Sequence, residues 1–132
     1  MSTHPTPASP SRSHRMRLSY SGVCALLVTV IVVELARRGG GYGQLAAFGP
    51  APDLALVLGV GTGLARGQLH PRAVTAYNLL HRAWGPVALG TLTIAGVLPT
   101  AFLIGALAWG LHVALDRALG YGLRTRDGFQ RP

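Results

Sequence analysis

Two ionisable side chains lie in an apolar stretch near the end of the chain, where Trp109–Gly122 reads W-G-L-H-V-A-L-D-R-A-L-G-Y-G. His112 and Asp116 are four residues apart, so a helix stacks them on one face. Ionisable groups are expensive inside a membrane-spanning helix and often mark a functional site there. Imidazole and carboxylate are also donor groups for divalent metals.

Further polar side chains occur at comparable positions in two other apolar segments. Residues 73–98 contain Tyr77, Asn78 and His81, and Asp53 lies within residues 42–65. If these segments are helices that reach the inner membrane surface, the helical rise places His81 and His112 at depths of about 13 Å and 12 Å. The sequence therefore predicts one polar cluster in the inner half of the membrane, comprising Asp53, Tyr77, Asn78, His81, His112, Asp116 and Arg117.

A metal site is the most specific hypothesis for this cluster. His81, His112 and Asp116 would be ligands, with Asp53 or Asn78 as a fourth ligand or as a hydrogen-bonding neighbour. Two imidazoles and a carboxylate suit Zn²⁺ or Fe²⁺. Metal-dependent hydrolysis would be available if one coordination position stayed open. The chain has no H-E-x-x-H motif, so the spacing does not identify the reaction.

Two other hypotheses use the same residues. In a packing or binding network, the polar side chains hydrogen-bond across helices, and Arg82 pairs with Asp53 or Asp116. This network needs the fewest additional assumptions, so we expect it rather than an enzyme. In the other hypothesis the cluster forms a pathway for protons or a small solute, which would require an oligomer because four helices are few for a carrier.

The elements that must position these residues are predicted by composition and apolar runs. Hydrophobic residues make up 49% of the chain and charged residues only 12%, against about 25% charged in soluble domains. The pattern predicts an all-α integral membrane bundle of four transmembrane helices, over about residues 18–36, 42–65, 73–98 and 101–121. We expect kinks at Gly49–Pro52 and at Gly85-Pro86. Residues 1–17 are predicted to be a disordered basic tail and residues 124–132 a basic C-terminal tail.

The arginines predict the orientation of the four helices. The chain has a net charge of +8 and no lysine. Placing both termini in the cytoplasm puts nine arginines on the inner side, Arg37 and Arg38 outside, and Arg82 within a helix, as the positive-inside rule requires. The arginines lie at the ends of apolar runs, so the lipid bilayer, and not nucleic acid, is the expected partner. Glu34 is expected to pair with Arg37 or Arg38.

Small residues offer surfaces for close helix packing. Gly59 and Gly63 form a G-x-x-x-G pair. A second ridge follows one side of the last apolar run at Ala106, Gly110, Ala114 and Ala118. Faces of this kind favour a homo-oligomer.

Several short motifs resemble those of one family. They are Pro52-Asp53-Leu54, Tyr77-Asn78-Leu79-x-His81, and His112-x-x-x-Asp116-Arg117-x-x-Gly120-Tyr121-Gly122-Leu123 followed by Gly128-Phe129. Over about residues 18–130 the chain resembles an uncharacterised bacterial family of small four-helix membrane proteins, domain of unknown function 4260. The resemblance implies a multi-pass protein of the bacterial inner (plasma) membrane and supports the cluster, but it implies no activity. The chain lacks the family's further polar tail with its His-containing motif.

A second resemblance rests on two dipeptides. Pro52-Asp53 and His81-Arg82 are similar to pairs found in membrane-bound metal-dependent hydrolases.

Overall fold

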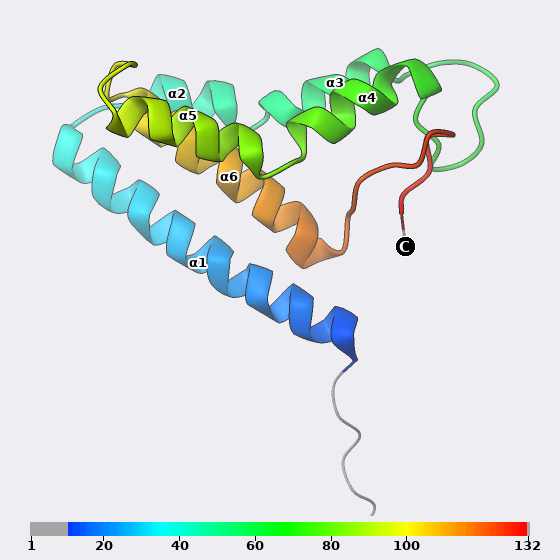
Figure 1. Ribbon diagram of the computed structural model, residues 1–132, viewed down its shortest axis with the longest axis horizontal. Coiled ribbons are helices and arrows are strands. Elements are labelled where there is room, and N and C mark those ends of the chain that lie inside the picture. Colours follow the sequence, from blue (N-terminus) through cyan, green and yellow to red (C-terminus); the bar gives the residue numbers. More distant parts are fainter. Residues whose placement is uncertain (1–10, 132) are drawn as a thin grey trace, which may run out of the picture.

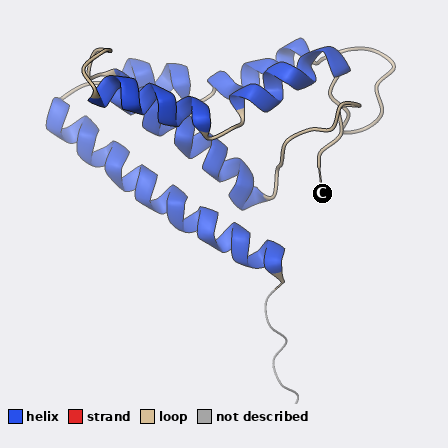
Figure 2. Cartoon of the chain, in the orientation of Figure 1, coloured by secondary structure: helices blue, strands red, loops and turns tan. Residues whose placement is uncertain are grey.

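The computed structural model describes residues 11–131. In that range the regular elements are helices joined by loops and turns (Figure 2), and an isolated β-bridge pairs Arg124 with Gln130. The predicted all-α class is confirmed. The elements in chain order are α1 (Arg12–Arg38), α2 (Tyr42–Phe48), the 3₁₀ turn η1 (Ala51–Asp53), α3 (Leu54–Leu58), α4 (Pro71–Leu80), α5 (Trp84–Ile94) and α6 (Phe102–Leu119).

The chain runs back and forth four times (Figure 1). The first and fourth passes are the continuous helices α1 and α6, which lie antiparallel and pack along each other. The second pass consists of α2, η1 and α3, and the third of α4 and α5. Helices α2 and α5 pack against α6, whereas α3 packs against α4. The sequence predicted four continuous helices, whereas the second and third of these runs are broken.

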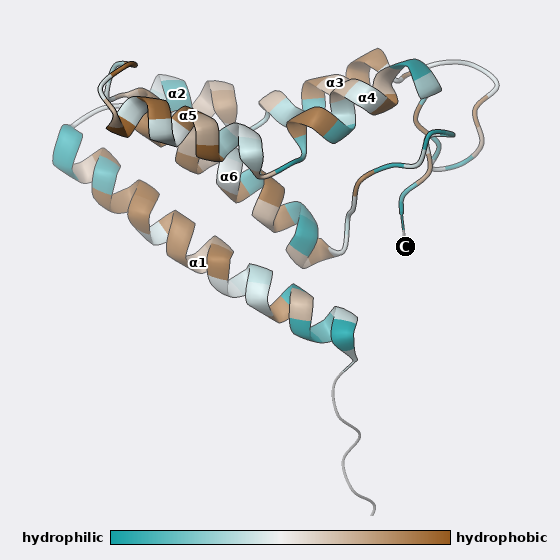
Figure 3. Ribbon diagram, viewed as in Figure 1, coloured by the Kyte–Doolittle hydropathy of each residue, from teal (hydrophilic) through white to brown (hydrophobic). Residues whose placement is uncertain are grey.

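Helices α1 and α6 are each long and apolar enough to cross a membrane, with 27 and 18 residues. At about 1.5 Å per residue they measure about 40 Å and 27 Å. Figure 3 shows that α1 is apolar along its middle and hydrophilic at both ends. The second and third passes contain no helix of that length, so the expected helices 42–65 and 73–98 are not continuous.

Helix α1 begins earlier than its apolar run. Ser11 caps its N-terminus by accepting from the His14 amide at 3.4 Å. Residues 12–17 were predicted to be disordered but form the first turns of this helix, and the remainder of that predicted tail, residues 1–10, lies outside the described range. At the other end, Glu34 pairs with Arg37 and Arg38 at 3.4 Å and 2.7 Å, as predicted.

The second pass breaks at Gly49–Pro52, as predicted, but its helix ends at Leu58 instead of continuing to residue 65. Gly59 approaches the Leu69 side chain so closely that an added Cβ would lie 1.9 Å from Leu69 Cδ1. Gly63 lies in the loop that follows. The expected G-x-x-x-G helix-packing pair is therefore wrong, because these glycines shape a chain reversal.

The third pass breaks at His81–Ala83, one turn before the expected kink at Gly85-Pro86. Pro86 is the third residue of α5, where a missing N–H leaves no helical hydrogen bond unmade. A continuous helix would instead bring the proline ring against the carbonyl of Arg82. Proline thus starts a new helix and moves the break upstream to His81.

The C-terminal segment folds back as a strap, here defined as residues 121–131. Gly120 ends α6 with a φ of 93°, and Arg17 of α1 donates to the carbonyls of Ala118 and Leu119. In the strap, the Gly128 carbonyl accepts from the Leu69 amide at 2.9 Å. A Cβ on Gly128 would lie 1.8 Å from the Leu69 carbonyl oxygen, so this contact requires glycine.

Candidate functional site

The breaks in the second and third passes meet beside the unbroken helix α6. Asp53 is the last residue of η1, and His81 follows the last residue of α4. Both face His112 and Asp116 of α6, and these four side chains are called here the His/Asp cluster. The structure therefore brings together residues from three passes at the points where two helices end.

The polar atoms of the His/Asp cluster converge closely. Asp53 Oδ1 lies 3.5 Å from Nε2 of His81 and 3.5 Å from Nε2 of His112. Asp116 Oδ2 lies 3.4 Å from His81 Nε2 and 4.0 Å from His112 Nε2. The imidazole rings meet edge to face, with centroids 5.3 Å apart.

His81 has a fixed orientation and tautomer. Its side chain is fully buried, and Nδ1 lies 2.8 Å from the main-chain oxygen of Tyr77. A carbonyl oxygen only accepts, so Nδ1 must carry the proton, and in the neutral ring Nε2 presents a lone pair. The Tyr77 ring stacks on the imidazole at a centroid distance of 3.8 Å. The lone pair is thereby aimed at the carboxylates.

The His/Asp cluster is exposed on one side, at Asp53. The Asp53 side chain is 50% exposed, whereas those of His112 and Asp116 are only 15% and 19% exposed. Within the described residues, Nε2 of neither histidine has a hydrogen-bond partner. Buried polar atoms without partners are uncommon and call for an unseen partner such as water or an ion.

Two side chains of α6 satisfy the backbone at the break after α4. Trp109 Nε1 donates to the Leu80 carbonyl at 2.7 Å, and Arg117 Nη2 donates to the His81 carbonyl at 2.8 Å. A helix end deep in a bundle needs such partners for its freed carbonyls. Arg117 thus holds the main chain of His81 in place and does not contact the cluster's imidazoles in these hydrogen bonds.

From the sequence we assign no role to Trp109. Its spacing was the available signal, because Trp109, His112 and Asp116 share one helical face.

Asn78 lies outside the His/Asp cluster. Its side-chain amide donates to the Arg124 carbonyl at 2.9 Å and accepts from the Arg124 amide at 2.7 Å, which ties the strap to α4. The Arg124 guanidinium lies 5.0 Å from the centroid of the Tyr77 ring. The expectation that Asn78 is a ligand or a direct neighbour of the ligands is therefore wrong, since its hydrogen bonds are used on the strap.

Arg82 was expected to pair with Asp53 or Asp116. It is exposed, and the ion pairs in the described part of the chain do not include it.

Asp53, His81 and His112 form a group that could hold a metal ion, because one donor atom from each lies within 4.8 Å of the others. Asp116 adjoins both histidines without belonging to this group of three. The sequence hypothesis had instead placed Asp116 with the two histidines, and Asp53 as a fourth ligand or a hydrogen-bonding neighbour.

The sequence matches the family model described as Domain of unknown function (DUF4260) over residues 21–132. The chain belongs to this family. The matched range contains the whole His/Asp cluster and the strap, and the family inferred from the motifs, domain of unknown function 4260, is confirmed. Neither the curated proteins nor the solved structures gave a match. The DUF4260 assignment names no activity, so the function must be argued from the site.

Proposed function

We propose that this DUF4260 protein is a multi-pass protein of the bacterial inner membrane that binds one divalent metal ion, Zn²⁺ or Fe²⁺, at the His/Asp cluster. The ligands are Asp53, His81 and His112, and Asp116 lies beside the ion. The observation that carries the proposal is the position of Asp53 Oδ1, 3.5 Å from both imidazole Nε2 atoms. Tetrahedral zinc with donors at about 2.0–2.1 Å separates those donors by about 3.3–3.4 Å.

The hydrogen bond to His81 supports a metal ligand in particular. Metal-binding histidines usually donate from the nitrogen that does not bind the metal, often to a backbone carbonyl. His81 meets this description, with Nδ1 on the Tyr77 carbonyl and Nε2 toward Asp53. A packing network should instead leave each buried nitrogen hydrogen-bonded, whereas both Nε2 atoms lack such a partner among the described residues.

Charge balance also favours a cation. Asp53 and Asp116 both approach the histidines, and the described ion pairs join neither carboxylate to an arginine. Carboxylates at this depth in a bilayer need a counter-charge. A bound divalent ion would supply this positive charge, whereas two neutral histidines would not.

The membrane arrangement is part of the proposal. The four passes cross the bilayer with both termini in the cytoplasm, and the breaks in passes two and three lie in its inner half. Broken helices are tolerated in membranes where protein groups satisfy the freed backbone, as Trp109 and Arg117 do here.

Metal-dependent hydrolysis is a second candidate function, favoured by the exposure of Asp53. Catalytic zinc sites keep three protein ligands and one open position for water. The half-exposed Asp53 leaves one side of the cluster open, and Asp116 would accept a hydrogen bond from a bound water.

Elemental analysis of the detergent-purified full chain tests the metal proposal. The wild type should carry about one zinc or iron per chain. His112→Ala should lose it, whereas His14→Ala, which removes an exposed histidine of α1, should retain it. A wild type that stays free of metal after dialysis against Zn²⁺ and Fe²⁺ would overturn the proposal.

A further inference from the structure

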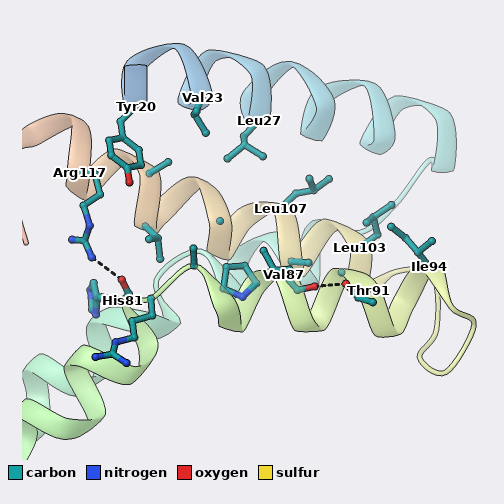
Figure 4. A pocket seen from close by; sticks show the side chains of 18 residues that line it. Tyr20, Val23, Leu27, His81, Val87, Thr91, Ile94, Leu103, Leu107 and Arg117 are labelled. Carbon is teal, nitrogen blue, oxygen red and sulfur yellow. Dashed lines mark hydrogen bonds between the residues drawn. The ribbon is translucent and has the colours of Figure 1, made fainter. Parts of the chain in front are cut away.

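A groove with a volume of about 600 Å³ runs between α1 and α5, with α6 as its floor (Figure 4). Val23 and Leu27 of α1 form one wall, and Val87 and Ile94 of α5 form the other. The groove lies on the side of α6 away from His112 and Asp116, neither of which lines it. Of the three proposed metal ligands only His81 lines it, and the His81 side chain is fully buried, so the groove adjoins the proposed metal site without containing it.

Small residues make the floor of the groove deep. Ala106, Gly110 and Ala114, three members of the small-residue ridge in the sequence, lie along it. A Cβ placed on Gly110 would still be 3.8 Å from Pro86 and 3.9 Å from Leu27. The ridge thus faces an open apolar space between two helices.

One end of the groove is cationic. Arg82, Arg117 and Tyr20 are among the residues that line the groove, and Figure 4 shows Arg117 and Tyr20 at the end near His81 and the break after α4. Arg117 donates to the carbonyls of His81 and Tyr121, and no carboxylate of the described residues pairs with Arg82 or Arg117. Apolar walls with two uncompensated positive charges at one end complement an amphiphile with an anionic head.

The dimensions suit an acyl chain. From Arg117 to Leu103, α6 rises about 21 Å, which exceeds half of the roughly 30 Å hydrocarbon core. A volume of about 600 Å³ is typical of small-molecule sites. A partner helix, with a diameter of about 10–12 Å over a similar length, would not fit within it.

We propose that this groove binds an anionic phospholipid of the inner leaflet. One acyl chain lies along Ala106, Gly110 and Ala114, and the phosphate lies against Arg82 and Arg117. Arginine binds phosphate oxygens through paired N–H donors, which gives a preference for anionic over zwitterionic heads. This inference uses the membrane setting but not the metal ion.

Native mass spectrometry of the delipidated full chain tests the head-group preference. The probes are phosphatidylglycerol and phosphatidylcholine with the same two oleoyl chains. We expect one phosphatidylglycerol per chain, bound at least about tenfold more tightly than phosphatidylcholine. Arg82→Gln should remove that preference. Arg66→Gln, an equal loss of charge at an exposed position of the 59–70 loop, should preserve it.

A second pair of variants tests the groove itself. Val87→Trp projects into the groove from an exposed position and should weaken binding of both lipids about tenfold or more. Leu92→Trp places the same side chain at an exposed position of α5 outside the groove and should bind like the wild type. Metal content measured on the same samples should not change, which separates this proposal from the metal site.

Three results would overturn the proposal. They are equal affinity for the two lipids, an equal loss in Arg66→Gln and Arg82→Gln, and wild-type binding by Val87→Trp. Displacement of phosphatidylglycerol by an equimolar amount of oleate would identify a fatty-acid site instead and would also contradict it.

Discussion

Nη2 of Arg117 lies 2.8 Å from the main-chain oxygen of His81, so the continuous helix α6 holds the residue at which the third pass breaks. His81 itself turns its imidazole toward Asp53 and Asp116. The break in the third pass and the position of His81 in the cluster therefore depend on the same contact with α6. The position of the proposed ligand depends on a backbone hydrogen bond that a substitution can remove.

Replacing Arg117 with methionine should destabilise the fold. The change keeps much of the apolar stem but leaves the buried His81 carbonyl without its donor, which costs about 1–3 kcal/mol. The melting temperature in detergent should fall by several degrees. Arg126→Met, at an exposed position of the strap, is the control and should melt like the wild type. Equal melting temperatures for the two variants would show that the bond contributes little.

Replacing Asn78 with leucine should release the strap. The side chain keeps a similar size but loses both hydrogen bonds to the Arg124 backbone. Each lost bond to a partly buried group is worth about 1 kcal/mol, so the detached state should rise about tenfold or more. Trypsin cleavage after Arg126 should accelerate by a similar factor. Thr75→Val, on the exposed side of α4, should leave the rate unchanged, and an unaltered rate in Asn78→Leu would contradict this role.

The sequence could predict the helical class and the proximity of the two histidines. Apolar runs mark the four passes, and helical rise from a shared surface places His81 and His112 at nearly one depth. His112 and Asp116 face the cluster because their spacing of four is fixed within α6. These features depend on local periodicity alone.

The breaks and the strap could not be predicted in the same way. Proline showed that the third pass would bend, but the bend lies at His81 because Trp109 and Arg117 satisfy the freed carbonyls there. The role of Asn78 depends on a strap 46 residues further along the chain. Its polar side chain indicated a buried partner but did not identify which one.

Cysteine labelling of intact cells checks the four-pass topology. In a Cys24→Ala background, Gly40→Cys should react with a membrane-impermeant maleimide from outside. A side chain is tolerated at Gly40, since nothing lies within 4 Å of its Cβ position. Arg126→Cys, in the strap, should react only after the cells are permeabilised, because the positive-inside rule places it in the cytoplasm. If Gly40→Cys is labelled only after permeabilisation, the proposed orientation is wrong.

The two carboxylates of the cluster should respond differently to the same substitution. Asp53 Oδ1 is 3.5 Å from both Nε2 atoms, so Asp53→Asn should abolish stoichiometric metal binding. Asp116 is 3.4 Å from one imidazole but 4.0 Å from the other. Asp116 is proposed as a neighbour of the ion and not a ligand. Asp116→Asn should therefore still bind the metal, with an affinity about 10–100-fold weaker. Competition with a zinc chelator measures both affinities, with His14→Ala as the unchanged control. If Asp116→Asn loses zinc as completely as Asp53→Asn, Asp116 is a fourth ligand. The site would then be closed and structural, because no position would remain for the water that hydrolysis requires.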